Sequence, residues 1–90
     1  MSFPERLAVR ISPEEISAGE RLSGENCPVA LALKRKTGLR WVVGRVSALA
    51  TGPGNAKAYY DIPPAVTKFI RAFDDYERVR PMTAVLLKRG

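Results

Sequence analysis

The alternation of apolar and polar residues divides the chain into strand-like and helix-like segments. Residues 6–11 alternate with a period of two, which predicts a strand. Further strands are predicted at 39–49, 56–61 and 82–88, because each segment is rich in β-branched or aromatic residues or bounded by turn residues. Gly44 interrupts the second of these and predicts either a bulge in the strand or a close approach of another backbone segment.

Three helices are predicted between these strands. A short one starts at Ser12-Pro13-Glu14-Glu15, a capping box, and stops before Gly19. A second spans 28–36, where the apolar residues face all directions and indicate a buried helix. The third and most regular spans 64–78. Its apolar residues form one stripe that contains Val66, Phe69, Ile70, Phe73 and Tyr76.

This order predicts a single α+β domain over residues 1–90, a small antiparallel sheet with helices on one face. With the first two helices taken as one arm, the order is β-α-β-β-α-β, which is that of a ferredoxin-like fold. In that fold the first and third strands lie at the centre of the sheet. An irregular three- or four-stranded antiparallel layer is the alternative, because element order alone does not determine topology.

Charge is distributed unevenly along the chain. The net charge is +6, and residues 26–60 contain six basic residues and no acidic one. A basic segment attracts polyanions or acidic protein surfaces. The predicted binding residues are therefore Lys34, Arg35, Lys36, Arg40, Arg45 and Lys57. Trp41, Tyr59 and Tyr60 share the predicted hairpin with three of these cations, a combination used to stack bases and contact phosphates. Alternation predicts that Trp41 and one of the two tyrosines belong instead to the core.

The residue types in the chain give little support for a catalytic function. The chain has no histidine and a single cysteine, Cys27. Without histidine the commonest general base and zinc ligand is missing, so we expect no enzyme, no cofactor and no metal. Cys27 precedes a helix and is interpreted as a cap or a small buried residue rather than a reactive thiolate. The segment 51–57 lacks the spacing of a phosphate-binding loop and is interpreted as a hairpin turn. Asp74, Asp75 and Glu77 are interpreted as a solvated helix face.

Two segments resemble those of small uncharacterised proteins encoded by bacteriophages and prophages. They are Asn26-Cys27-Pro28-Val29-Ala30-Leu31-Ala32-Leu33 and Pro63-Pro64-Ala65-Val66-Thr67-Lys68-Phe69-Ile70-Arg71-Ala72-Phe73-Asp74. The resemblance implies a phage-type accessory protein and carries no activity or binding residue with it. It favours two hypotheses, a protein that binds nucleic acid or a nucleoprotein complex, and an inhibitor or adaptor that binds a host defence complex through a basic face or a sheet edge.

The remaining expectations concern location and assembly. No apolar run is long enough for a membrane helix, and the first residues do not form a signal peptide, so a cytoplasmic location is expected, in the host cell if the protein is phage-encoded. A homodimer is compatible with both hypotheses, because a small sheet has two edges at which strands can pair.

Overall fold

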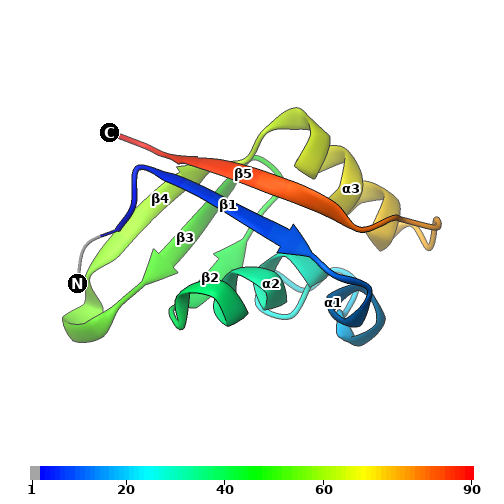
Figure 1. Cartoon of the computed structure of the whole chain (residues 1–90), viewed down its shortest axis with the longest axis horizontal. Helices are drawn as coiled ribbons and strands as arrows, with labels where there is room; N and C mark the ends of the chain where they lie inside the picture. Colours follow the sequence, from blue (N-terminus) through cyan, green and yellow to red (C-terminus); the bar gives the residue numbers. More distant parts are fainter. Residues whose placement is uncertain (1–2) are drawn as a thin grey trace.

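The computed structural model describes residues 3–90 as one antiparallel sheet and three α-helices (Figure 1). The strands are β1 (Arg6–Ile11), β2 (Arg40–Val43), β3 (Ser47–Thr51), β4 (Lys57–Asp61) and β5 (Met82–Lys88). The helices are α1 (Pro13–Ala18), α2 (Pro28–Thr37) and α3 (Pro64–Asp74), with a short 3₁₀ turn, η1 (Pro53–Asn55), between β3 and β4. The α+β class and the presence of three helices between the strands are therefore as predicted.

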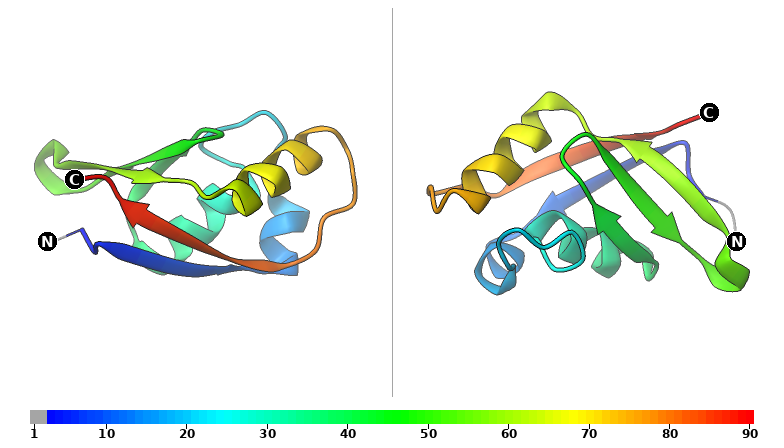
Figure 2. Two further views of the ribbon diagram at one scale, coloured as in Figure 1. Left: turned by 90° about the horizontal axis from the view of Figure 1, so that it is seen from above. Right: turned by 180° about the vertical axis from the view of Figure 1, so that it is seen from behind.

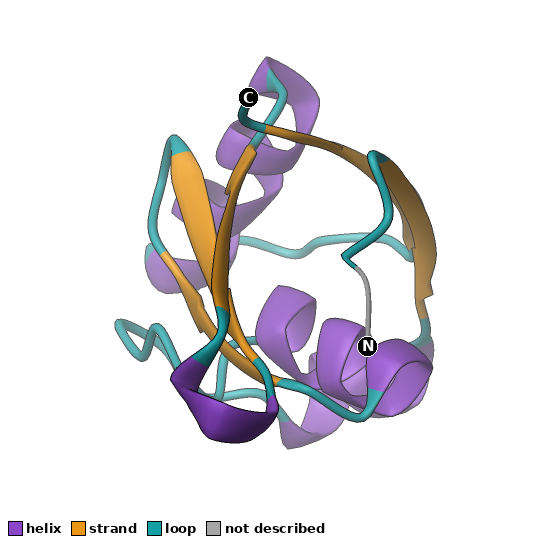
Figure 3. Cartoon of the chain, turned by 90° about the vertical axis from the view of Figure 1, so that its left-hand side faces the viewer, coloured by secondary structure: helices purple, strands orange, loops and turns teal. Residues whose placement is uncertain are grey.

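The ferredoxin-like topology is not confirmed, because the sheet order is β1-β5-β4-β3-β2. The first strand lies at one edge of the sheet instead of at its centre. β4 and β5 pair only through Tyr60 with Lys88 and Asp61 with Leu87, which links the hairpin formed by β2, β3 and β4 to the β1–β5 pair. The sheet curls, and an end-on view shows the two parts facing each other across the interior (Figure 3).

The predicted strand over 39–49 is two strands, which changes the count from four to five. The amide of Gly44 donates to the carbonyl of Ser47 at 2.8 Å, and Arg45 and Val46 form the tip of a tight hairpin. The inward positions change phase at this turn, from Trp41 and Val43 to Ala48 and Ala50. A continuous strand would keep one phase, so the prediction of a single strand over 39–49 was wrong, and Gly44 does not form a bulge in it. The alternative, a close backbone approach at Gly44, is what the structure has, since a Cβ at this position would lie 3.2 Å from the Ser47 carbonyl oxygen.

α3 is shorter than predicted because the chain reverses after Asp74. The amide of Glu77 donates to the carbonyl of Ala72, and that of Tyr76 to Phe73, which is the Schellman pattern of helix termination. Tyr76 takes the left-handed position of this pattern, with φ of 63°, which is usually occupied by glycine. Tyr76 therefore leaves the apolar stripe and is exposed.

The core lies on the inner side of the curled sheet, where α2 and α3 pack (Figures 1 and 3). Trp41 and Tyr60 are fully buried, and their ring centroids are 5.3 Å apart. The indole Nε1 of Trp41 donates to Thr37 Oγ1 at 2.8 Å, and the Tyr60 hydroxyl donates to the Pro4 carbonyl at 2.7 Å. These bonds satisfy the polar atoms that the two large rings carry into the core.

α2 lies between the two edge strands of the curled sheet and contacts both β1 and β2. The views from above and behind show this helix on the open side of the sheet (Figure 2). The preceding loop also reaches the β2 edge, since the Val43 amide donates to the Gly24 carbonyl at 2.8 Å. Both edge strands thus contact other parts of the chain. Fewer of their backbone groups are therefore free to pair with a strand of a partner. Among residues 3–90, no helix is both long and apolar enough to cross a lipid bilayer.

Candidate functional site

The outer sheet face consists of the strand side chains that point away from the core. Antiparallel pairing arranges those of β2, β3 and β4 in rows that cross the strands. One row, here called the basic row, is Arg40, Thr51 and Lys57. The next, the apolar row, is Val42, Leu49 and Tyr59. Because the helices pack on the inner side, both rows remain accessible to solvent.

The apolar row contains two large hydrophobic side chains that are exposed to solvent. Tyr59 is 51% exposed and Val42 is 47% exposed. Leu87 of β5, opposite Asp61 and two residues before Arg89, is 55% exposed on the same outer side. Three of the six large hydrophobic side chains exposed among the described residues therefore lie on this face. Such a grouping is typical of a binding surface, whereas single exposed apolar residues are not.

A hollow of about 310 Å³ lies over the basic row. Arg40 and Lys57 line it from β2 and β4, and Lys34 lines it from α2. The Lys34 ammonium donates to the Glu25 carbonyl at 2.6 Å, which holds this side chain at the rim. Glu25 is the one acidic residue among those that line the hollow. Three cations from three elements thus surround one depression beside Tyr59.

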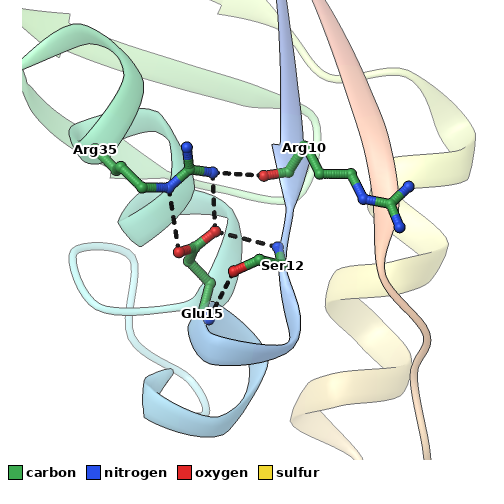
Figure 4. A network of polar contacts seen from close by, with 4 residues as sticks. All are labelled: Arg10, Ser12, Glu15 and Arg35. Carbon is green, nitrogen blue, oxygen red and sulfur yellow. Dashed lines mark hydrogen bonds and ion pairs between the residues drawn. The ribbon is translucent and has the colours of Figure 1, made fainter.

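Arg35 has a different role from the one predicted. Its guanidinium holds the Glu15 carboxylate through Nε and a terminal nitrogen at 3.2 and 3.0 Å, and it donates to the Arg10 carbonyl at 2.7 Å (Figure 4). Glu15 also closes the capping box with Ser12. The hydrogen bond from Arg35 lowers the pKa of the Glu15 carboxyl. Arg35 therefore connects α2, α1 and the edge of β1.

The other predicted cations do not reach the hollow. Lys36 is exposed on α2 and is absent from its lining. Arg45 is exposed at the β2–β3 turn, where its carbonyl accepts a hydrogen bond from Thr67 of α3. The structure thus brings together three of the six predicted residues, Lys34, Arg40 and Lys57, and places Arg35, Lys36 and Arg45 elsewhere.

Alternation alone explains which aromatics belong to the site. Trp41 faces the core and the two tyrosines point to opposite faces, as predicted, and the structure identifies Tyr60 as the buried one and Tyr59 as the exposed one. Val42, Leu49 and Thr51 were not predicted as site residues. The period of two that assigned Trp41 to the core could also have identified Val42 as an outward residue, whereas Leu49 and Thr51 depend on the phase change at the hairpin.

Cys27 is the N-cap of α2, as predicted. Its sulfur accepts from the Ala30 amide at 3.5 Å, and its side chain is buried. Burial raises the pKa of this thiol, which opposes formation of a thiolate. Among residues 3–90, no three histidine, cysteine or acidic side chains are grouped so that they could hold a metal ion. Asp74 instead accepts from the Leu22 amide at 2.9 Å and ties the loop before α2 to the end of α3.

Comparison with known proteins found no matching family model, no similar curated protein and no similar solved structure. The resemblance to phage-encoded proteins therefore stays a prediction.

Proposed function

We propose that this protein binds single-stranded nucleic acid on its outer sheet face. The observation that carries the proposal is the pairing register, which sets the basic row directly beside the apolar row that contains Tyr59. Proteins that bind single strands combine cations that follow the phosphates with an aromatic ring on which a base stacks. Here Tyr59 is the stacking residue, and Arg40 and Lys57, with Lys34 at the rim, contact phosphate.

A single strand is favoured over a duplex because of the shape of this surface. Helices that read duplex DNA insert into the major groove, whereas here Arg40 and Lys57 lie on strands of the sheet. The outer face is an open sheet, on which unstacked bases can lie flat. The phage-type setting implied by the resemblance is compatible with such an accessory protein, and the alternative of a host protein partner is an outcome of the test below.

The test is a fluorescence-anisotropy titration with labelled single-stranded and double-stranded oligonucleotides. Three phosphate contacts predict a slope of about −2 in log K against log salt, which is a loss of roughly 20-fold between about 50 and 200 mM salt. Replacement Tyr59→Ala should weaken single-strand binding about 5- to 100-fold through lost stacking, whereas Tyr59→Phe should bind like wild type.

Matched controls separate this site from general positive charge. Arg40→Ala with Lys57→Ala should weaken binding and reduce the magnitude of the salt slope by about 1.4, since each phosphate contact contributes about 0.7 on a single strand. Lys36→Ala with Arg78→Ala removes the same charge from exposed positions outside the hollow and should leave most of the affinity. Equal losses in both double variants would refute the assigned site. Absence of binding at low salt would refute the function and direct attention to a protein partner for the same face.

A further inference from the structure

α3 borders a second surface, separate from the outer sheet face. An open groove of about 610 Å³ runs along the solvent side of this helix. Its apolar lining comes from Val46 at the β2–β3 turn, Ile62, Pro64 and Ala72. Val46 is an aliphatic residue, and it is 69% exposed to solvent at this turn. None of the residues that line this groove belongs to the basic row or the apolar row.

The charged residues of the groove are separated by sign along the helix. Lys68 and Arg71 lie in the middle of α3, and Asp75 and Glu77 lie at its end. All four are exposed, and none takes part in the three ion pairs found among residues 3–90. The arrangement has a positive half and a negative half, with Ala72 between them.

A two-fold rotation places the positive half of one such groove opposite the negative half of the groove in a second copy. In a two-fold symmetric pair, residue i of one copy meets residue j of the other, and the reverse contact also forms. Two antiparallel α3 helices that cross at Ala72 set Lys68 and Arg71 of each copy opposite Asp75 and Glu77 of the other. The small side chain at Ala72 allows the helix axes to approach to about 8–10 Å.

The chain reversal after α3 adds a second observation. Tyr76 holds a left-handed backbone conformation, with φ of 63°, which is unfavourable for a residue with a side chain. The residue is 79% exposed, and the Arg21 guanidinium contacts its ring at 4.1 Å from the ring centroid. Residues held in such sparsely populated backbone conformations cluster at functional sites. The reversal also brings Glu77 back to the groove.

We propose that a second copy of this chain docks in the α3 groove and forms a two-fold symmetric dimer. Charge complementarity between the two halves of the groove selects this occupant. The proposal does not depend on nucleic-acid binding, because the outer sheet faces of both copies stay uncovered.

Analytical ultracentrifugation of charge-reversed variants tests this dimer. Variant one carries Lys68→Glu and Arg71→Glu, so its groove is wholly acidic. Variant two carries Asp75→Lys and Glu77→Lys, so its groove is wholly basic. Wild type should dimerise in a salt-sensitive manner, and each variant alone should associate at least about 10-fold more weakly. An equimolar mixture of the two should form a heterodimer, because opposite grooves then face each other.

Two further variants keep the result interpretable. Glu14→Lys with Glu20→Lys makes the same change of net charge as variant two at exposed positions outside the groove, and it should dimerise like wild type. Ala72→Gln adds bulk at the crossing point while it retains helix propensity, and it should abolish the dimer without change in the circular dichroism spectrum. A wild-type chain that stays monomeric up to about 1 mM would overturn the proposal. So would variants that dimerise as wild type does, or a mixture that does not restore association.

Discussion

Replacement of Arg35 by methionine should destabilise the protein although the side chain lies at the surface. The guanidinium makes three hydrogen bonds, two to Glu15 and one to the carbonyl of Arg10. Glu15 is 11% exposed as a side chain, whereas Arg35 is 52% exposed. Methionine keeps most of the aliphatic stem, so the change isolates the polar contacts.

The magnitude follows from the exposure of the two partners. Hydrogen bonds to charged groups contribute about 1.5–3 kcal/mol when buried, and fully exposed ion pairs contribute about 0–1 kcal/mol. Because one partner is shielded and the other is half exposed, we expect a loss of about 1–2 kcal/mol. For a domain of this size that corresponds to a decrease in Tm of roughly 5–12 °C. Lys36→Met on the same helix is the matched control and should change the free energy of unfolding by less than about 0.5 kcal/mol.

The contribution of Arg35 should also depend on pH. Its hydrogen bond lowers the pKa of Glu15 in the folded state, so this stabilisation is present at neutral pH and is lost as pH falls through the lowered pKa. Urea denaturation of wild type and Arg35→Met at about pH 7 and about pH 3 should therefore show a smaller difference at the acidic pH. An equal difference at both pH values, or a cost no larger than that of Lys36→Met, would refute this role for Arg35.

Two other predictions concern groups in the core. Thr37→Val should cost about 1–3 kcal/mol in urea denaturation, because it leaves the indole N–H of Trp41 without its acceptor, whereas Thr37→Ser should restore most of the loss. Cys27 should react with iodoacetamide at about pH 8 at least about 100-fold more slowly in the folded protein than in denaturant, because burial raises its pKa. Rapid modification of the folded chain would contradict this interpretation.

Local patterns predicted most elements of this fold, because the signals for them lie within a few residues. Ser12 and Glu15 define the start of α1 by a capping box, and Cys27 and Gly38 bound α2. Two boundaries could not be predicted in this way. The turn at Arg45 and Val46 contains no residue pair typical of a tight hairpin, and Tyr76 occupies a position where glycine is expected. In both cases tertiary contacts outweigh local preference.

The order of the strands in the sheet could not be predicted from these local sequence patterns, for a related reason. The ferredoxin-like prediction rests on the order of the elements and on right-handed crossovers that place the first and third strands at the centre of the sheet. Here the segment between β1 and β2 instead contacts both edge strands of the sheet. The Arg35 guanidinium donates to the Arg10 carbonyl of β1, and the Val43 amide of β2 donates to the Gly24 carbonyl. These contacts join residues that are about 20 positions apart. A period of two or of 3.6 residues does not encode such distances.

The same limit explains why the predicted basic segment separates in space. Charge counts assign Lys34, Arg35 and Lys36 to one cluster because they are consecutive, but consecutive helical residues point about 100° apart. Lys34 is directed to the hollow, Arg35 to the end of β1 and Lys36 to solvent. In contrast, Arg40 and Lys57 are 17 positions apart and become members of one row because each pairs with Thr51. Pairing register, more than net charge, therefore determines which cations can bind a ligand together, and it is the register that sets Tyr59 beside them.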